Sequence, residues 1–485
     1  MKQLLRCLII AITFGLTLFP EFSIAKTLNI LVHPFENTGN KEFSWISAGM
    51  TDTVITDLAR IKTINVVSND DRKKIIEEMK FIFSGLTEED KMMKTGKLIG
   101  ANIIFTGRYL VSGDRIRVHA RLVNVETGKV ENTAKIDGTV GGIFDLQDKV
   151  VFALMGETER IQMLDIQPVK LTEEDKKAIE DKPRHKANAY EWYAKGLELQ
   201  DTHPKEALVA FNKALDIDPQ YTHALMAAGF TAAWPLNLFS EAFEYLERAE
   251  KVFSGRQETN TPSYARLMSS VGIVYFQKGQ FDRALEYYLK AKSIVDRIGR
   301  GNSANYSSLM MIIGNTYMNM GKLDRALEYY TTARSIKDGS GLQNTSDYAL
   351  LMTISGFAYW RKGQWDRALE YYTNAQSIWD RLRLQNTSFY AIVLMHIGNA
   401  YKDKGQLDRA LEYCKNSLAL REKLGLQNTV HHGHLLLSIG DIYQKKGQED
   451  RAGQFFRKAY DAYVESGYVG KEKKWALKGA QRLGY

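Results

Sequence analysis

The sequence predicts a chain of two parts: an α/β domain with a mixed sheet and packed helices, followed by an all-α solenoid of repeated helix pairs. Two observations predict this division. Over residues 27–165, short apolar stretches of strand type alternate with helical spacing, whereas from Asn188 onward the spacing is helical throughout. Within the helical part, one six-residue string recurs at an interval of 42 residues. A fixed period of this size indicates stacked supersecondary units, because each unit needs a neighbour to bury its apolar face.

The first 25 residues follow the pattern of a secretory signal peptide. Lys2 and Arg6 give a positively charged start, residues 8–19 form an apolar stretch too short to span a bilayer comfortably, and residues 23–25 offer small side chains for cleavage. We therefore expect an exported protein, with a retained membrane anchor as the alternative. Cleavage would leave Cys414 as the one cysteine of the sequence, which excludes an intramolecular disulfide.

Residues 26–165 are predicted to form the α/β domain, in the order β-α-β-α-α-β-β-β-α. The predicted strands cover residues 28–32, 64–67, 103–111, 115–125 and 130–139. The predicted helices cover residues 44–58, 68–79, 87–99 and 143–164. The fourth strand alternates apolar and basic side chains, so we expect one face to be buried and the other to meet water or a partner. Its basic side chains are Arg115, Arg117, His119 and Arg121.

Residues 166–186 are charged and contain two prolines, so we interpret them as a linker with a short helix at residues 173–180. Residues 187–485 are predicted to form the solenoid, with about seven helix pairs and a capping helix at residues 471–482. The whole chain carries a formal net charge of +8, with basic and acidic residues interleaved and no basic stripe. This distribution gives no indication of nucleic-acid binding.

Five units of the solenoid align column by column. The string Asp-Arg-Ala-Leu-Glu-Tyr begins at Asp282 and recurs three times, and a diverged copy begins at Asp450. Each first helix has a glycine at the same place and a tyrosine three residues later. The glycines are Gly272, Gly314, Gly356, Gly398 and Gly440. Glycine and alanine at fixed places let two helices approach closely, and the tyrosines and leucines fill the remaining volume.

Two details of these columns have simple structural interpretations. Cys414 stands where three other copies have tyrosine, so we expect it to fill the core rather than to act as a nucleophile. The aspartate of the repeated string begins a helix, where it complements the helix dipole. Its arginine and glutamate are expected to face water rather than to form a charged binding track.

These columns, together with Ala207, Phe211, Ala214 and Pro219 in an earlier unit, resemble the tetratricopeptide family. The resemblance is to the 42-residue variety found in kinesin light chains and many bacterial signalling scaffolds, and it covers about residues 188–465. The chain departs from the kinesin type by using Asn-Thr in the loop where proline is common. The resemblance implies a non-catalytic scaffold that binds a protein partner, either an extended peptide or a helix, on its concave face.

The candidate partner-binding residues are those that differ between copies at two positions of the first helix. They are Ile273, Phe276, Asn315, Met318, Phe357, Trp360, Asn399 and Lys402. Shared residues are needed for stacking, so specificity is expected in the variable ones. The alternative for Phe276 and Trp360 is that they pack between units.

Four segments of the N-terminal part resemble the α/β domain of curli-secretion and flagellar outer-membrane proteins, the CsgG/FlgO-like group. The segments are residues 31–37, 64–68, 100–107 and 122–128. The resemblance implies a bacterial cell-envelope protein, periplasmic or outer-membrane-associated, that joins an envelope complex. It does not imply a secretion pore, because a lipidated cysteine and long membrane-spanning hairpins are missing from the sequence. Self-association through this domain, using the wet strand face, is an alternative function.

The sequence indicates no catalytic, cofactor-binding or metal-binding residues. His431, His432 and His434 lack a cysteine or acidic partner at ligand spacing, so a solvated helix start is the preferred interpretation. The glycines near residue 140 lack the context of a phosphate-binding loop. We therefore expect no enzyme. An enzyme or nucleotide sensor would require ionisable residues that converge within residues 27–165.

Overall fold

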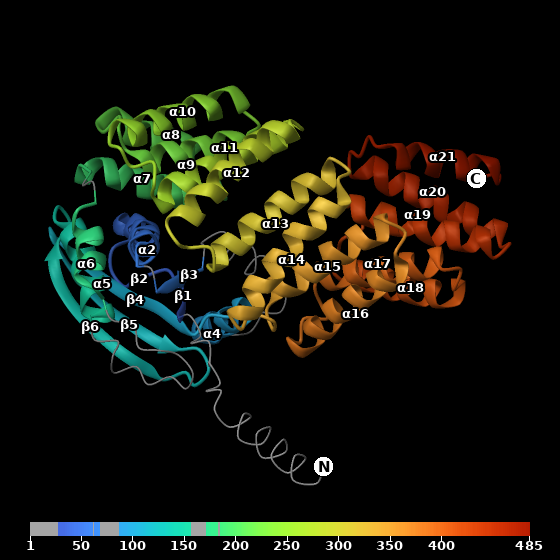
Figure 1. Cartoon of the computed structure of the whole chain (residues 1–485), viewed down its shortest axis with the longest axis horizontal. Coiled ribbons are helices and arrows are strands. Elements are labelled where there is room, and N and C mark those ends of the chain that lie inside the picture. Colours follow the sequence, from blue (N-terminus) through green and yellow to red (C-terminus); the bar gives the residue numbers. More distant parts are fainter. Residues whose placement is uncertain (1–27, 62, 68–86, 157–170, 183–184) are drawn as a thin grey trace, which may run out of the picture.

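The computed structural model describes residues 28–61, 63–67, 87–156, 171–182 and 185–485. They form an N-terminal mixed sheet with packed helices, followed by a solenoid (Figure 1). This confirms the predicted fold class. Among the described residues, no helix combines the length and apolar character needed to cross a bilayer.

The described sheet combines parallel and antiparallel pairing. Its strands are β1 (Leu28–Val32), β2 (Glu36–Asn37), β3 (Ile64–Val66), β4 (Ile103–Ser112), β5 (Arg115–Asn124) and β6 (Val130–Thr139). The order is β3-β1-β4-β5-β6, with β2 paired to β4; β1 runs parallel to β3 and β4, whereas β4, β5 and β6 pair antiparallel. The five longer strands lie where the sequence predicts them. Sequence reasoning missed β2, because two residues are too short to show a period.

Helices cover both faces of the sheet. The described helical elements of this part are η1 (Lys41–Phe43), α2 (Trp45–Leu58), α4 (Glu88–Ile99), α5 (Ile143–Met155) and α6 (Glu173–Glu180). Ile30 and Phe105 face the core formed with α2 and α5, whereas Leu31 and Ile104 face a smaller core formed with α4. Alternation along each strand produces these two faces.

Three of the four helices predicted in this part can be compared with the described residues. The helix expected to run to residue 164 ends at Met155, and the Gly156 N–H bonds back to the Phe152 carbonyl. The rest of that expectation, and the whole helix predicted at residues 68–79, lie outside the described residues. Helix α4 begins and ends as expected: Thr87 accepts from the Asp90 N–H, and Gly100 closes the helix at φ +73°.

The solenoid contains seven helix pairs and a final helix. The pairs are α7 (Ala187–Leu199) and α8 (Pro204–Ile217), α9 (Thr222–Ala233) and α10 (Phe239–Gly255), α11 (Pro262–Gln277) and α12 (Phe281–Arg297), α13 (Ala304–Asn319) and α14 (Leu323–Gly339), α15 (Ser346–Arg361) and α16 (Trp365–Arg381), α17 (Ser388–Asp403) and α18 (Leu407–Lys423), and α19 (Val430–Lys445) and α20 (Glu449–Glu465). The final helix is α21 (Lys471–Arg482), which packs on α20. From α11 to α20, a Ser or Thr caps each first helix, and the glycine before each second helix has φ between +71° and +77°.

The first-helix glycines bring the two helices of a pair into close contact. A Cβ atom added at Gly314 would lie 2.5 Å from the Tyr330 ring, and Gly272 and Gly356 face tyrosines in the same way. Gly398 instead faces the Cys414 sulfur. The Cys414 side chain is fully buried, and burial raises the pKa of its thiol to about 12. It fills the core, as the sequence predicted.

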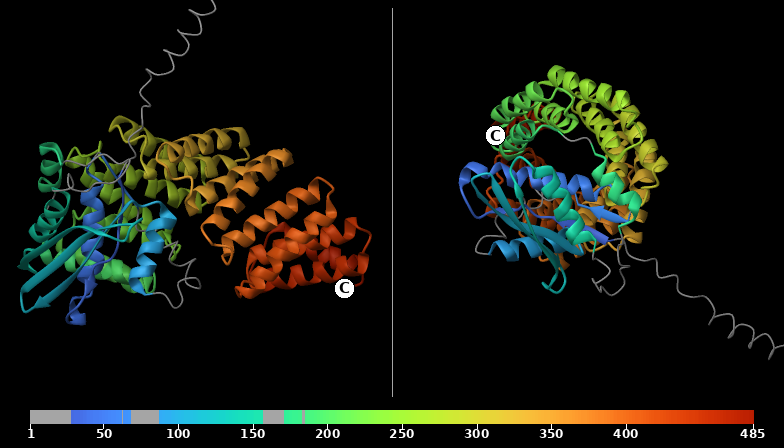
Figure 2. Two further views of the ribbon diagram at one scale, coloured as in Figure 1. Left: turned by 90° about the horizontal axis from the view of Figure 1, so that it is seen from below. Right: turned by 90° about the vertical axis from the view of Figure 1, so that its left-hand side faces the viewer.

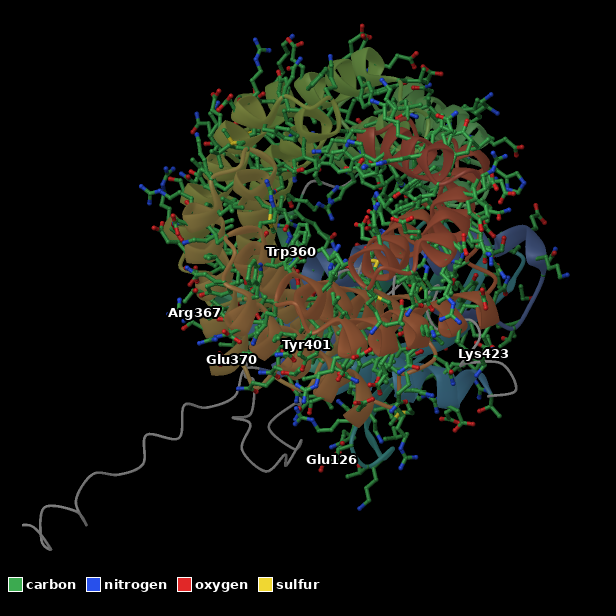
Figure 3. All side chains as sticks on the ribbon, turned by 90° about the vertical axis from the view of Figure 1, so that its right-hand side faces the viewer. Glu126, Trp360, Arg367, Glu370, Tyr401 and Lys423 are labelled. Carbon is green, nitrogen blue, oxygen red and sulfur yellow. The ribbon has the colours of Figure 1, made fainter. Side chains whose placement is uncertain are left out.

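The charged residues of the repeated string lie on the outer surface, where they join neighbouring units. Arg367 and Glu370 lie toward the outer margin of the solenoid (Figure 3). Asp324, in the first turn of α14, forms an ion pair with Lys362 of the next unit, and the following two units repeat this pair. The Arg367 guanidinium carbon lies 5.6 Å from the Tyr359 ring centre. The string therefore has a structural role in stacking.

The α/β domain lies across one side of the curved solenoid and contacts it at α7, α13 and α15 (Figure 2). At the first helix pair, the Tyr193 hydroxyl donates to Asp52 at 2.7 Å, and Tyr190 lies buried against α2. At the fifth pair, the Ser346 hydroxyl donates to the Leu98 carbonyl at 3.2 Å. The domain thus bridges α7 and α15.

Residues of the expected linker pack on the α/β domain. The Lys182 side chain is only 9% exposed and forms ion pairs with Asp57 at 2.5 Å and with Asp148 at 2.7 Å. Helix α6 spans the predicted residues, and its Ile179 side chain is fully buried. These contacts fix the described residues 171–182 against the α/β domain.

Candidate functional site

The candidate partner-binding residues lie on four successive first helices of the solenoid. They occupy two positions three residues apart on each of α11, α13, α15 and α17, so the two share one helical face. The first helices α15, α17 and α19 also touch one another, as expected for the tighter side of a curve. Figure 3 shows Trp360 toward the inside of the solenoid.

The fifth unit presents a half-buried aromatic pair. The rings of Phe357 and Trp360 stack with their centres 5.5 Å apart, and both side chains keep partial exposure. The Trp360 indole N–H donates to an Asp403 carboxylate oxygen at 2.8 Å, so this residue also joins α15 to α17. The same side chain thus contacts the neighbouring unit and leaves apolar surface on the inner face.

The sixth unit is polar at the matching positions. The Lys402 ammonium lies 3.6 Å from the Asp441 carboxylate, and burial raises the pKa of Asp441. The side-chain amide oxygen of Asn399 (Oδ1) is buried and accepts no hydrogen bond from any described residue. By contrast, the side-chain amide oxygen of Asn315 accepts from the Tyr330 hydroxyl at 2.6 Å. Cys414 replaces that tyrosine in the Asn399 unit, which explains the missing donor.

The earlier units offer less accessible surface. Met318 is only 7% exposed, so it lies in the core rather than on the inner surface. Phe276 packs edge-on against Phe281 of the same unit at 5.3 Å between ring centres, and Ile273 is half-buried. The structure therefore brings Phe357, Trp360 and Asn399 together on adjacent first helices, two units away from Ile273.

Sequence reasoning missed His396, which completes the aromatic cluster. Its ring centre lies 5.4 Å from those of Phe357 and Tyr372. Burial lowers the pKa of His396 to about 4, so the imidazole is neutral at pH 7. Its column has isoleucine at residues 312 and 354, and this change of residue type was the available signal.

Of the three histidines at the start of α19, His431 is exposed, as expected for a solvated helix start, but His432 and His434 are not. His432 is only 6% exposed, and the His434 ring packs against Tyr463 and Tyr468. Burial lowers the pKa of His432 to about 4. These side chains therefore help to pack the seventh pair. Within the described ranges, no three His, Cys, Asp or Glu residues are placed to hold a metal ion.

Comparison with known families agrees with the repeat geometry. Family models described as tetratricopeptide repeat match residues 228–302, 307–338, 356–384 and 389–464. The C-terminal part of this chain is built of tetratricopeptide repeats. Repeats of this family generally form non-catalytic scaffolds that bind protein partners.

Individual relatives are distant. A protein described as putative adenylate cyclase 3 from Rhizobium meliloti (strain 1021) is 24% identical over 196 residues, which cover 39% of this chain and 30% of that protein. The chain thus spans less than a third of that relative's length. The crystal structure of the apo form of RapI covers 57% of this chain and 98% of its own, at 16% identity and a TM-score of 0.46. A tetratricopeptide repeat protein from Parabacteroides merdae covers 61% and 99%, at 15% identity and a TM-score of 0.44.

Proposed function

We propose that this protein is an exported, non-catalytic scaffold of a bacterial cell envelope that binds a protein partner on the inner face of its fifth and sixth repeat units. One observation carries the proposal. A constant stacking framework holds an aromatic pair, Phe357 and Trp360, next to Asn399, whose side-chain amide oxygen has no donor among the described residues.

The chemistry of this surface suits an extended peptide or a short helix. The half-buried rings offer apolar area to a partner side chain, which favours association when it is removed from water. After a side-chain movement, the side-chain amide oxygen of Asn399 can accept from a partner's backbone N–H, which would satisfy a buried acceptor. Lys402 lies one turn further along α17, and its pairing with Asp441 leaves that end of the surface polar.

The cellular setting rests on the N-terminal part. The signal-peptide pattern of the first 25 residues supports export, and the resemblance to the CsgG/FlgO-like group supports an envelope location with association into an envelope complex. A fusion of residues 1–40 to alkaline phosphatase, which is active only after export, tests this step. An inactive fusion would remove the envelope from the proposal.

Site-specific photocrosslinking tests the binding surface. A photoreactive amino acid placed at Asn399 should crosslink one envelope protein, and the same residue placed at Arg367 on the outer surface should not. In the Phe357→Ala, Trp360→Ala double variant the crosslink should disappear, while thermal unfolding shows that the other units remain folded. An equal crosslink from both positions, or a full crosslink without the two rings, would contradict the proposed surface.

Self-association is a second candidate, favoured by the position of β6. This strand forms one edge of the sheet, and the neighbouring outer face of β5 exposes Arg115, Arg117 and His119. An edge strand can pair with a second copy unless charge or covering elements prevent it. Light scattering of the full chain tests this candidate, and a monomer mass at all concentrations would exclude it.

A further inference from the structure

Half of the formal net charge of this chain is concentrated in its last helix. The whole chain carries +8, and the 12 residues of α21 include five basic residues and one acidic residue, Glu472. Basic and acidic residues are interleaved along the rest of the sequence, whereas basic residues predominate in this last helix. A capping helix needs only a polar outer face, so this excess of one sign calls for another explanation.

Four of the five basic residues of α21 form a stripe on its outward face. Ala476 and Ala480 are fully buried against the seventh pair. The opposite face of the helix is exposed, and its residues are spaced three, four or seven residues apart. It consists of Lys471, Lys474, Trp475, Lys478 and Arg482. Among the described residues, none of these four basic groups has an acidic partner within ion-pair distance.

An exposed tryptophan lies within this stripe. Trp475 is 55% exposed and lies beneath the Lys471 ammonium, which is 5.1 Å from its ring centre. Val469, just before the helix, is 89% exposed. Of the ten large apolar side chains exposed among the described residues, four lie in residues 464–485. Exposed apolar groups and unpaired positive charge thus occur together at one end of the molecule.

We propose that the outer face of α21 binds the surface of an anionic lipid bilayer. Lysine and arginine are attracted to anionic headgroups, and tryptophan prefers the boundary between headgroups and acyl chains. The helix lies at the outer end of the solenoid, away from the α/β domain (Figure 1), so a flat surface can approach it. An acidic protein would satisfy the charges, but it would give the exposed Trp475 and Val469 no apolar environment unless it also carried a matching apolar surface. This inference does not depend on the inner-face site.

Vesicle flotation of the full chain tests the proposal. Vesicles of equal parts phosphatidylcholine and phosphatidylglycerol should bind the protein, and vesicles of phosphatidylcholine alone should not. The Lys474→Glu, Lys478→Glu variant should lower partitioning roughly 30-fold or more, because each basic group near the surface contributes to binding. The control variant Lys149→Glu, Lys205→Glu changes the net charge equally at exposed helical positions elsewhere and should retain partitioning. Binding through the N-terminal segment would persist in both variants.

A second measurement separates a bilayer from an acidic polypeptide. Brominated lipid should quench part of the tryptophan fluorescence of the parent protein, and the Trp475→Phe variant should bind vesicles but lose most of that quenching. Equal partitioning of both charge variants would overturn the proposal. So would binding to polyglutamate without binding to anionic vesicles, which would assign the face to an acidic protein.

Discussion

Replacing Gly314 with alanine should destabilise the fourth helix pair by about 2–4 kcal/mol. The new Cβ would lie 2.5 Å and 2.7 Å from two carbons of the Tyr330 ring, and 3.2 Å from the Ala326 carbonyl oxygen. Carbon atoms normally approach to about 3.5–4.0 Å, so the ring or the helices must move by about 1 Å. Overpacking of this kind costs about 1–3 kcal/mol, and displacing Tyr330 adds about 1 kcal/mol for its hydrogen bond to Asn315.

Gly339, in the second helix of the same pair, provides a matched control. A Cβ added there meets no atom within 4 Å, and its backbone is helical. Gly339→Ala should therefore leave stability unchanged or raise it by up to about 1 kcal/mol, because alanine restricts the unfolded chain. Urea denaturation followed by circular dichroism compares the two variants. Hydrogen exchange in α13 and α14 shows whether the effect is local, as expected for a solenoid.

A double-mutant cycle tests the physical reason. If the clash with Tyr330 causes the loss, then Gly314→Ala should cost less than about 1 kcal/mol in a Tyr330→Ala background, where the ring is absent. The same cost in both backgrounds would refute the steric explanation, and so would equal effects of alanine at Gly314 and Gly339.

Three further predictions concern buried groups. The Cys414 thiol should not react with a thiol reagent at pH 8 until the protein is unfolded, because burial raises its pKa to about 12; mass spectrometry of labelled Cys414 after a brief pulse would show any earlier reaction. Burial raises the pKa of Asp57 to about 6 despite Lys182, which is above its value in the unfolded chain. The folded state therefore takes up an extra proton as the pH falls from 7 to 5, and the parent should gain stability relative to Asp57→Asn over this range. A difference in melting temperature between the two proteins that stays constant would contradict this. Tyr193→Phe should lower the free energy of unfolding by about 1–3 kcal/mol, because it removes the hydrogen bond to Asp52. Hydrogen exchange should become faster in α2 and α7 and stay unchanged in α19, which serves as the internal control.

The repeat half was readable from sequence because its packing is local and repeated. Gly272 and its counterparts reappear every 42 residues, and each faces a side chain of the same pair, so one sequence contains several copies of the same packing solution. The strands of the α/β domain other than β2 were also predictable, because they show apolar or alternating residues bounded by turns.

Long-range contacts could not be read in this way. Nothing in the spacing around Ser346 indicates a contact with Leu98, which is 248 residues away. That the Asn399 side chain lacks a hydrogen-bond donor could be recognised only from the structure, which places Cys414 where other units have a tyrosine. The basic face of α21 was within reach of the sequence, because a helical wheel of residues 471–482 separates the lysines from Ala476 and Ala480.

The bridge between α7 and α15 has a mechanical consequence. A solenoid normally behaves as a spring whose curvature changes along its whole length, because each unit contacts only its neighbours. Here the α/β domain contacts both the first and the fifth unit, and we expect these contacts to resist a change of curvature between them. Bending is then expected mainly after α15, so that the last two helix pairs move relative to the rest of the molecule. The aromatic pair of Phe357 and Trp360 lies on α15, the helix at which the bridge ends.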